Sequence, residues 1–253
     1  MKSKKTKIIV SVVLAAALSV LSCFPVSADS YSTWTYKYSS FSTLTYRFRA
    51  RLELFSHGVF GTTYLESVSG APMMVDSVAI KAILLNSNNI IVSQSAMVKI
   101  SNATTSFAYD TYCSDSNTYH ARGYVKLPTA KSGNTYSLSA PYPTTDTASE
   151  TFVSGSTSSM PDVPLYYSSL TAEGYETNAK GETYGKITGA DNSGVFPDLI
   201  AAVGVNGNYG YVRYEDSFKD TYDRIDVTIP LYDSNGNVID TFILSGSEVT
   251  SKE

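Results

Sequence analysis

Five carboxylates are crowded into one short stretch of the chain, "YEDSFKDTYDRID". They are Glu215, Asp216, Asp220, Asp223 and Asp226. Two carboxyl groups held about 5 to 9 Å apart across a sugar are the machinery of a glycosidase, and several carboxylate oxygens around one point bind calcium. A solvated acidic loop between strands is the third interpretation. The spacing alone leaves all three open.

Three arginines share one face of a predicted strand. In "TLTYRFRARLEL" apolar residues alternate with Arg47, Arg49 and Arg51, and a period of two is typical of a half-buried strand. Side chains on one strand face lie about 7 Å apart, so the row could span successive anionic groups of a polymer such as teichoic acid, with Lys37 and Arg122 expected nearby. The alternatives are an edge strand kept soluble by charge and a face that docks on the acidic C-terminal half.

Other reactive groups are scarce. After residue 28 the histidines are His57, in a predicted turn, and His120, on the predicted outward face of a strand, and the remaining thiol is Cys113, which fits a small half-buried residue. Zinc sites need three or four ligands at short spacing, and the sequence contains neither H-E-x-x-H nor G-x-S-x-G. The sequence therefore favours a protein without catalytic activity.

The stretch "AVGVNGNYGYVRYEDSF" has three glycines at a spacing of three. A dinucleotide loop needs G-x-G-x-x-G before a helix, and a P-loop needs a final Gly-Lys-Ser/Thr; neither spacing occurs here. We predict that Asn206-Gly207 turns a hairpin and that Gly204 and Gly210 are bulge or close-packing positions. Asn235-Gly236 predicts a second tight hairpin.

The elements that must position these groups are strands. Alternation in "TLTYRFRARLEL" and "TYHARGYVKL", turn residues in "NSNN" and the many Tyr, Thr and Val residues predict an all-β fold. We expect an antiparallel β-sandwich over residues 29–140 and a smaller β-rich domain, SH3-like or built from hairpins, over residues 165–253. Residues 141–164 are rich in Ser, Thr and Pro and predict a linker.

The first 28 residues predict export. Four lysines precede an apolar run, and Val26-Ser27-Ala28 has small residues at the cleavage spacing, as in a secretory signal peptide. Lipidation of Cys23 in a lipobox-like sequence is the alternative. We expect an extracellular location and no transmembrane segment in the mature chain, since the remaining sequence has no sufficiently long apolar run.

Charge divides the mature chain into two unlike halves. Residues 1–28 hold four of the 19 basic side chains and none of the 23 acidic ones, so the formal charge of the rest is 15 minus 23, or −8. Residues 29–140 carry a net charge of +3, and residues 165–253 carry −8. An acidic chain without a recognisable nucleic-acid motif argues against nucleic acid as a partner.

Part of the second half resembles known modules. The pattern Asn206-Gly207, then Gly210-Tyr211-Val212, resembles the "NG-x-x-GYV" hairpin of bacterial SH3-like domains. Residues 171–244 as a whole are similar to an uncharacterised extracellular module of exported Gram-positive proteins. The strand before the turn, Ala201-Ala202-Val203, lacks the aromatic residue that commonly helps to form the SH3-like peptide groove. The resemblance implies an extracellular accessory unit and does not imply a catalytic activity. Residues 29–140 resemble no family that we recognise.

These observations lead to one leading hypothesis. We expect a secreted or cell-surface, non-enzymatic binding or accessory protein of a Gram-positive bacterium, whose partner is a cell-wall polymer or a surface protein. The expected contact residues are Arg47, Arg49, Arg51, Tyr209, Tyr211 and Arg213. A secreted glycan-directed hydrolase that uses a carboxylate pair is the alternative, and a small exported toxin or signal is a third. No cofactor is expected, apart from calcium at the acidic cluster.

Overall fold

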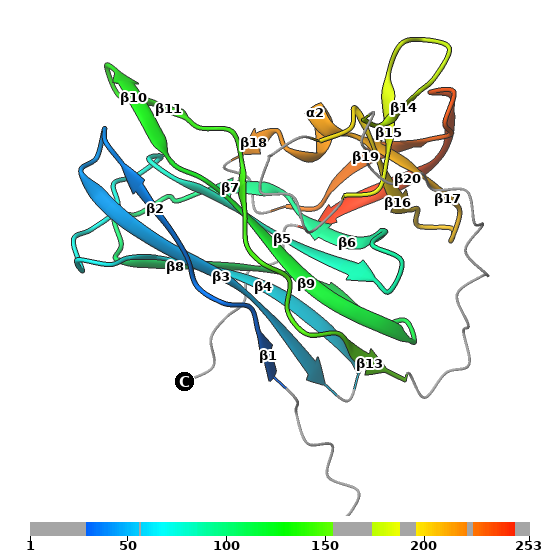
Figure 1. Ribbon diagram of the computed structural model, residues 1–253, viewed down its shortest axis with the longest axis horizontal. Coiled ribbons are helices and arrows are strands. Elements are labelled where there is room, and N and C mark those ends of the chain that lie inside the picture. Colours follow the sequence, from blue (N-terminus) through cyan, green and yellow to red (C-terminus); the bar gives the residue numbers. More distant parts are fainter. Residues whose placement is uncertain (1–28, 56, 154–173, 188–195, 222–224, 246–253) are drawn as a thin grey trace, which may run out of the picture.

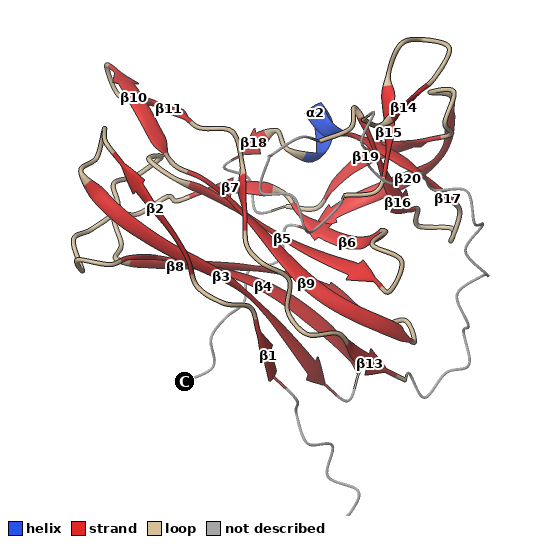
Figure 2. Cartoon of the chain, in the orientation of Figure 1, coloured by secondary structure: helices blue, strands red, loops and turns tan. Residues whose placement is uncertain are grey.

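The protein folds almost entirely into β-strands (Figures 1 and 2). The computed structural model describes residues 29–55, 57–153, 174–187, 196–221 and 225–245. We refer to residues 29–153 as the N-terminal part and to the described residues from 174 to 245 as the C-terminal part. The predicted signal peptide, residues 1–28, lies outside the described residues, as does Asp223.

The elements follow one another along the chain in this order: β1 (Asp29–Tyr31), β2 (Thr35–Ser39), β3 (Leu44–Phe55), β4 (Gly58–Ser67), β5 (Ala79–Asn86), β6 (Ile91–Ser95), β7 (Met97–Lys99), β8 (Ser106–Cys113), β9 (Asn117–Lys126), β10 (Pro128–Ser132), β11 (Thr135–Leu138), β12 (Tyr142–Pro143), β13 (Glu150–Phe152), β14 (Glu176–Thr177), β15 (Thr183–Gly185), β16 (Leu199–Val203), β17 (Tyr209–Arg213), α2 (Tyr214–Ser217), β18 (Asp220–Thr221), β19 (Val227–Tyr232) and β20 (Val238–Ser245).

Two sheets pack face to face, which confirms the predicted sandwich. The outer sheet has the strand order β1-β3-β4-β8, and β2 also pairs with β3. In the larger sheet β9, β5 and β6 are antiparallel neighbours. Close packing joins the two sheets: a Cβ added to Gly61 of the outer sheet would meet Leu84 at 2.8 Å. Alternation on β3 buries Phe48 and Leu52 between the sheets and turns the arginines outward.

The C-terminal part is built onto the larger sheet. Strand β6 pairs in parallel with β20 and, through Ala202 opposite Ile91, with β16. The C-terminal strands therefore continue the sheet of the N-terminal part beyond β6 (Figure 1). They also cover its outward face, because every residue of β5 is buried. The sandwich and the smaller β-rich part therefore share one extended sheet.

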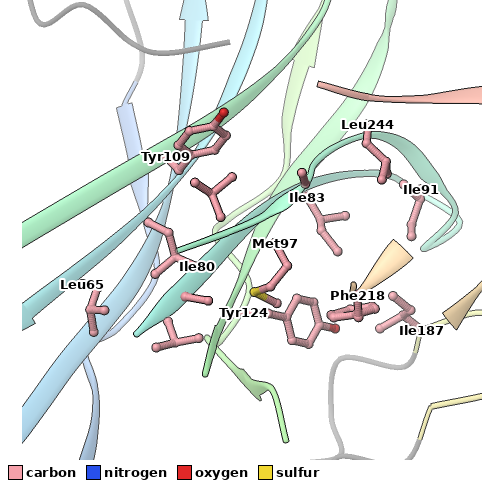
Figure 3. Packing of buried hydrophobic residues seen from close by; sticks show 14 of the residues in the cluster. Leu65, Ile80, Ile83, Ile91, Met97, Tyr109, Tyr124, Ile187, Phe218 and Leu244 are labelled. Atoms are coloured by element: carbon pink, nitrogen blue, oxygen red, sulfur yellow. The ribbon is translucent and has the colours of Figure 1, made fainter. Parts of the chain in front are cut away.

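A large hydrophobic cluster runs through both parts of the molecule. It contains Leu65 of the outer sheet, Ile80 and Ile83 of β5, and Phe218 and Leu244 of the C-terminal part. Figure 3 shows these side chains gathered on the two sides of the same strands. Since burial of apolar surface is the main favourable term in folding, the two parts stabilise one another.

A lysine lies where the N-terminal part meets the C-terminal part, a region that we call the junction. Lys81 is fully buried, and its Nζ donates hydrogen bonds to the carbonyls of Ser95 and Ser217. Burial lowers its pKa well below the usual 10.5, which favours the neutral amine. These two hydrogen bonds tie β6 to the end of α2.

A second polar group closes the junction beside β9. Arg122 is 1% exposed and donates two hydrogen bonds to the carboxylate of Asp146, at 2.6 and 2.7 Å. His120 Nε2 lies 3.7 Å from the same carboxylate and is buried. The expectation that His120 is exposed and that Arg122 lies near the arginine row is wrong. Both side chains lie on the outward face of β9, where Asp146 of the predicted linker lies beside them and Ile187 of the C-terminal part contacts Arg122.

The start of the predicted linker is part of the sandwich. Strands β12 and β13 both pair with β9, and the hydroxyl group of Thr147 accepts a hydrogen bond from the Ala121 amide. This segment has few apolar residues, yet its hydroxyl and carboxyl groups satisfy polar groups along β9. The remainder of the predicted linker, residues 154–164, lies outside the described residues.

Both predicted hairpin turns are confirmed. Gly207 and Gly236 have φ angles of 78° and 72° at the β16–β17 and β19–β20 turns. Gly204 packs against Asp240, whose carboxylate accepts hydrogen bonds from the Asn206 amide and the Asn206 side chain. The three glycines serve a turn and close packing, as the sequence predicted.

Replacing Lys81 with methionine is expected to destabilise the protein by about 1 to 3 kcal/mol, because two buried carbonyls lose their donor. Urea unfolding followed by circular dichroism measures the change. Lys219→Met, at an exposed position, should stay within about 0.5 kcal/mol of the wild type. Equal stability of Lys81→Met and wild type would show that these bonds do not hold the junction together.

Candidate functional site

The outward face of the outer sheet brings arginine and aromatic side chains together. Tyr31 of β1 pairs with Arg51, and Thr35 of β2 pairs with Phe48. Ser32 bonds with Ala50, so two residues of the β1–β2 segment stand opposite the single residue Arg49. This extra residue is a β-bulge, which redirects side chains locally. It brings Trp34 onto the same face as the arginines.

The resulting side chains alternate along β3. From one end to the other they are Arg47, Trp34, Arg49, Tyr31 and Arg51, and we call this set the arginine–aromatic ladder. The guanidinium carbon of Arg49 lies 4.3 Å from the Trp34 ring centroid and 4.2 Å from that of Tyr31. Arg47 lies 4.6 Å from Trp34, and Arg51 lies 5.6 Å from Tyr31. Cation–π attraction at these distances holds flexible arginine side chains in place.

Acidic neighbours neutralise the two ends of the ladder. Arg47 forms a 2.6 Å ion pair with Glu66, its cross-strand partner on β4, and this hydrogen-bonded carboxylate raises the pKa of Arg47. Arg51 pairs with Asp29 at 2.8 Å and with Glu53 at 2.7 Å. The three predicted arginines do lie together on one face, but two of them already have counter-ions.

Arg49 differs from its neighbours. It contacts two rings, yet among the described residues no carboxylate lies within ion-pair distance of it. Its cross-strand neighbour on β4 is Tyr64, where Arg47 has Glu66. A guanidinium that stacks on rings keeps its N–H groups for an anion, so Arg49 is the charge of the ladder that is best placed for a ligand.

One buried carboxylate belongs to the same sheet face. Asp110 of β8 pairs across β4 with Thr62, which in turn pairs with Arg51. Asp110 is 1% exposed, and within the described part of the chain its Oδ1 has no hydrogen-bond partner. Burial raises its pKa to about 6. The sequence analysis did not single out this residue, because its burial follows from packing.

The contact residues expected in the C-terminal part are largely engaged in internal contacts. Tyr211 is 6% exposed and its ring lies edge-on to that of Tyr184. Arg213 forms a 2.6 Å ion pair with Glu182 and lies over the Tyr232 ring. Tyr209 packs on the small cluster around Tyr211. These side chains stabilise the β16–β17 hairpin and its neighbours, so we centre the candidate site on the ladder.

The acidic cluster is spread over several elements. Glu215 and Asp216 lie on α2, whereas Asp220 lies on β18 and pairs with Lys126 at 2.6 Å. Asp226 lies immediately before β19. Within the described ranges, no three acidic, histidine or cysteine side chains form a group able to hold a metal ion. Calcium binding at this cluster therefore stays a prediction.

The sequence analysis missed the aromatic half of the ladder. Tyr31 and Trp34 precede the alternating strand and lie in a short segment without clear periodicity. Their only signal was position: two large aromatic residues three apart, about fifteen residues before a row of arginines on the same chain. The bulge that orients Trp34 depends on pairing with β3 and is not visible in the sequence.

No family model, curated protein or solved structure matches this chain. The likeness of residues 171–244 to an extracellular module therefore stays a prediction. Among the described residues, no helix is both long enough and apolar enough to cross a bilayer.

Asp110 is expected to lower the stability of the protein at neutral pH. Its pKa of about 6 lies above the ordinary 3.8, so between these values the folded state binds more protons, and stability falls as the pH rises. Asp110→Asn should add about 1 to 3 kcal/mol at pH 7 and flatten the pH dependence between the two pKa values. Thermal unfolding across this pH range measures both effects. Asp115→Asn, a change at an exposed aspartate on the same stretch of chain, is the control. If Asp110→Asn left the pH dependence of stability unchanged, the raised pKa of Asp110 would be contradicted.

Proposed function

We propose that this protein is a non-enzymatic binding protein that acts outside the cell at a bacterial surface, and that the arginine–aromatic ladder contacts an anionic cell-wall polymer. The observation that carries the proposal is Arg49, a cation held between two rings without an acidic partner among the described residues. The signal-peptide features of residues 1–28 support the extracellular setting.

The ladder is suited to anions more than to ring stacking. Guanidinium groups already contact the rings of Trp34 and Tyr31, so these rings have less free surface for a base or a sugar. The N–H groups of Arg49 form a fork that matches a phosphate or carboxylate. The ion pairs of Arg47 and Arg51 confine the uncompensated charge to the middle of the ladder.

A glycan hydrolase is less well supported. It needs two carboxylates that face each other across a sugar, and Asp220 of the acidic cluster is instead held by Lys126 and lies 3.9 Å from Lys99. We therefore develop the binding function alone.

Co-sedimentation with purified Gram-positive cell walls, with and without teichoic acid and across a salt series, tests the proposal. We expect binding that requires the polymer and weakens with salt. Arg49→Gln should weaken it by about tenfold or more, the typical worth of a hydrogen bond to a charged group. Lys219→Gln makes the same charge change at an exposed position of the C-terminal part and should bind like the wild type. Equal binding by both variants would refute a role for the ladder.

Removing a counter-ion should have the opposite effect. Glu66→Gln leaves the Arg47 guanidinium without its ion pair, so we expect several-fold tighter binding to the same walls. Glu215→Gln, at an exposed acid on α2, gives the same change in net charge. If both variants gained equally, net charge rather than the ladder would explain the affinity.

A further inference from the structure

Two hairpin tips lie next to each other at one end of the sandwich. The β2–β3 turn, residues 40–43, and the β10–β11 hairpin extend beyond the body of the two sheets (Figure 1). The Ser39 hydroxyl donates a hydrogen bond to the Pro128 carbonyl, and the rings of Phe41 and Tyr136 meet edge to face at 6.1 Å. A two-stranded hairpin alone is only marginally stable, so these contacts fix β10–β11 beside the turn.

The paired tips expose aromatic side chains. Phe41 is 42% exposed, and Tyr36 and Tyr38 of β2 are 55% and 63% exposed. Single apolar side chains on a surface are ordinary. Here Phe41 and the partly exposed Tyr136 lie on the two tips, and Tyr36 and Tyr38 lie on β2, which leads into the first of them. Such a concentration indicates an interaction surface.

The charge of the paired tips has one sign. Residues 35–43 and 128–139 contain Lys37 and Lys131 and no aspartate or glutamate. Both lysines are exposed, and the Lys131 ammonium lies 4.8 Å from the Tyr136 ring centroid. The aromatic rings therefore share their surface with cations although the mature chain as a whole is acidic.

We propose that the paired tips form a contact site for an anionic lipid bilayer. Aromatic residues favour the membrane–water interface, and a phenylalanine at an apex can enter the boundary between headgroups and acyl chains. Lysines beside it attract anionic headgroups and extend their ammonium groups toward water. Phe41 is the inserting side chain, Tyr38 and Tyr136 lie at headgroup level, and Lys131 faces the phosphates. Lys37, whose ammonium lies 5.0 Å from the Tyr142 ring centroid, adds positive charge nearby.

The turn that carries Phe41 is held in an unusual conformation. Thr43 has a φ angle of 54°, a region that a β-branched residue rarely adopts. Its hydroxyl donates to the Ser42 carbonyl, and the Ser42 hydroxyl lies 3.0 Å from that of Tyr46. Strained backbone that persists is concentrated at functional positions.

The experiment uses the mature chain and sedimentation with two kinds of vesicle: equal parts of phosphatidylglycerol and phosphatidylcholine, or phosphatidylcholine alone. We expect binding to the mixed vesicles only, weakened about fivefold in Lys131→Gln, the loss typical of one lysine near a charged surface. Phe41→Ser should lose about tenfold or more. Both positions are exposed, and unchanged melting temperatures would show that the variants remain folded.

Matched variants decide between the tips and the rest of the surface. Ile243 is also 42% exposed but lies on β20, so Ile243→Ser should bind vesicles like the wild type, as should Lys219→Gln. Arg49→Gln should lose wall binding and keep vesicle binding, which separates this proposal from the proposed function. No vesicle binding by the wild type, or equal losses in the tip variants and their controls, would overturn it.

Discussion

Burial of both faces of β5 and β9 is the constraint on which the rest of the structure depends. One face of each strand packs on the outer sheet, and the other packs beneath the C-terminal part. Lysine and arginine side chains on the second face cannot stay exposed, so Lys81 bonds to two carbonyls and Arg122 to Asp146. Breaking such a buried pair by removing one partner costs more than the pair itself contributes. The C-terminal part is thereby bound to a specific position on the sheet.

The same constraint decides which surface is left for recognition. The C-terminal part covers one side of the larger sheet. The outward face of the outer sheet is therefore the broad face of the sandwich on which polar and aromatic side chains stay partly exposed to solvent. Arginine and aromatic side chains there support one another, as the contacts of Arg49 with Trp34 and Tyr31 show. A pre-formed stack loses little side-chain entropy when a ligand arrives, so holding Arg49 in place favours affinity.

Sequence reasoning succeeded where a local pattern determines the structure. Alternation around Arg49 identified β3 and the face of its arginines, and Asn206-Gly207 identified a hairpin because positive φ angles are a local requirement. It failed where the answer depends on distant segments. His120 has the pattern of an exposed residue, yet it is buried beside Asp146 of the predicted linker. Pairing of Arg47 with Glu66 follows from strand register, 19 residues apart in sequence, and the bulge at Trp34 follows from the alignment of two short strands on β3.

Several locally unfavourable features lie on the outer sheet and its turns. Asp110 is buried with a raised pKa, Arg49 is a cation without an acidic partner among the described residues, and Thr43 has a positive φ angle. Each is unfavourable by itself, whereas the buried charges at the junction, such as Arg122, are satisfied. Folds violate local rules mainly at functional sites and compensate for them elsewhere. The paired charges at the junction provide part of that compensation. The C-terminal part thus stabilises the sandwich, and the outer sheet is available for recognition.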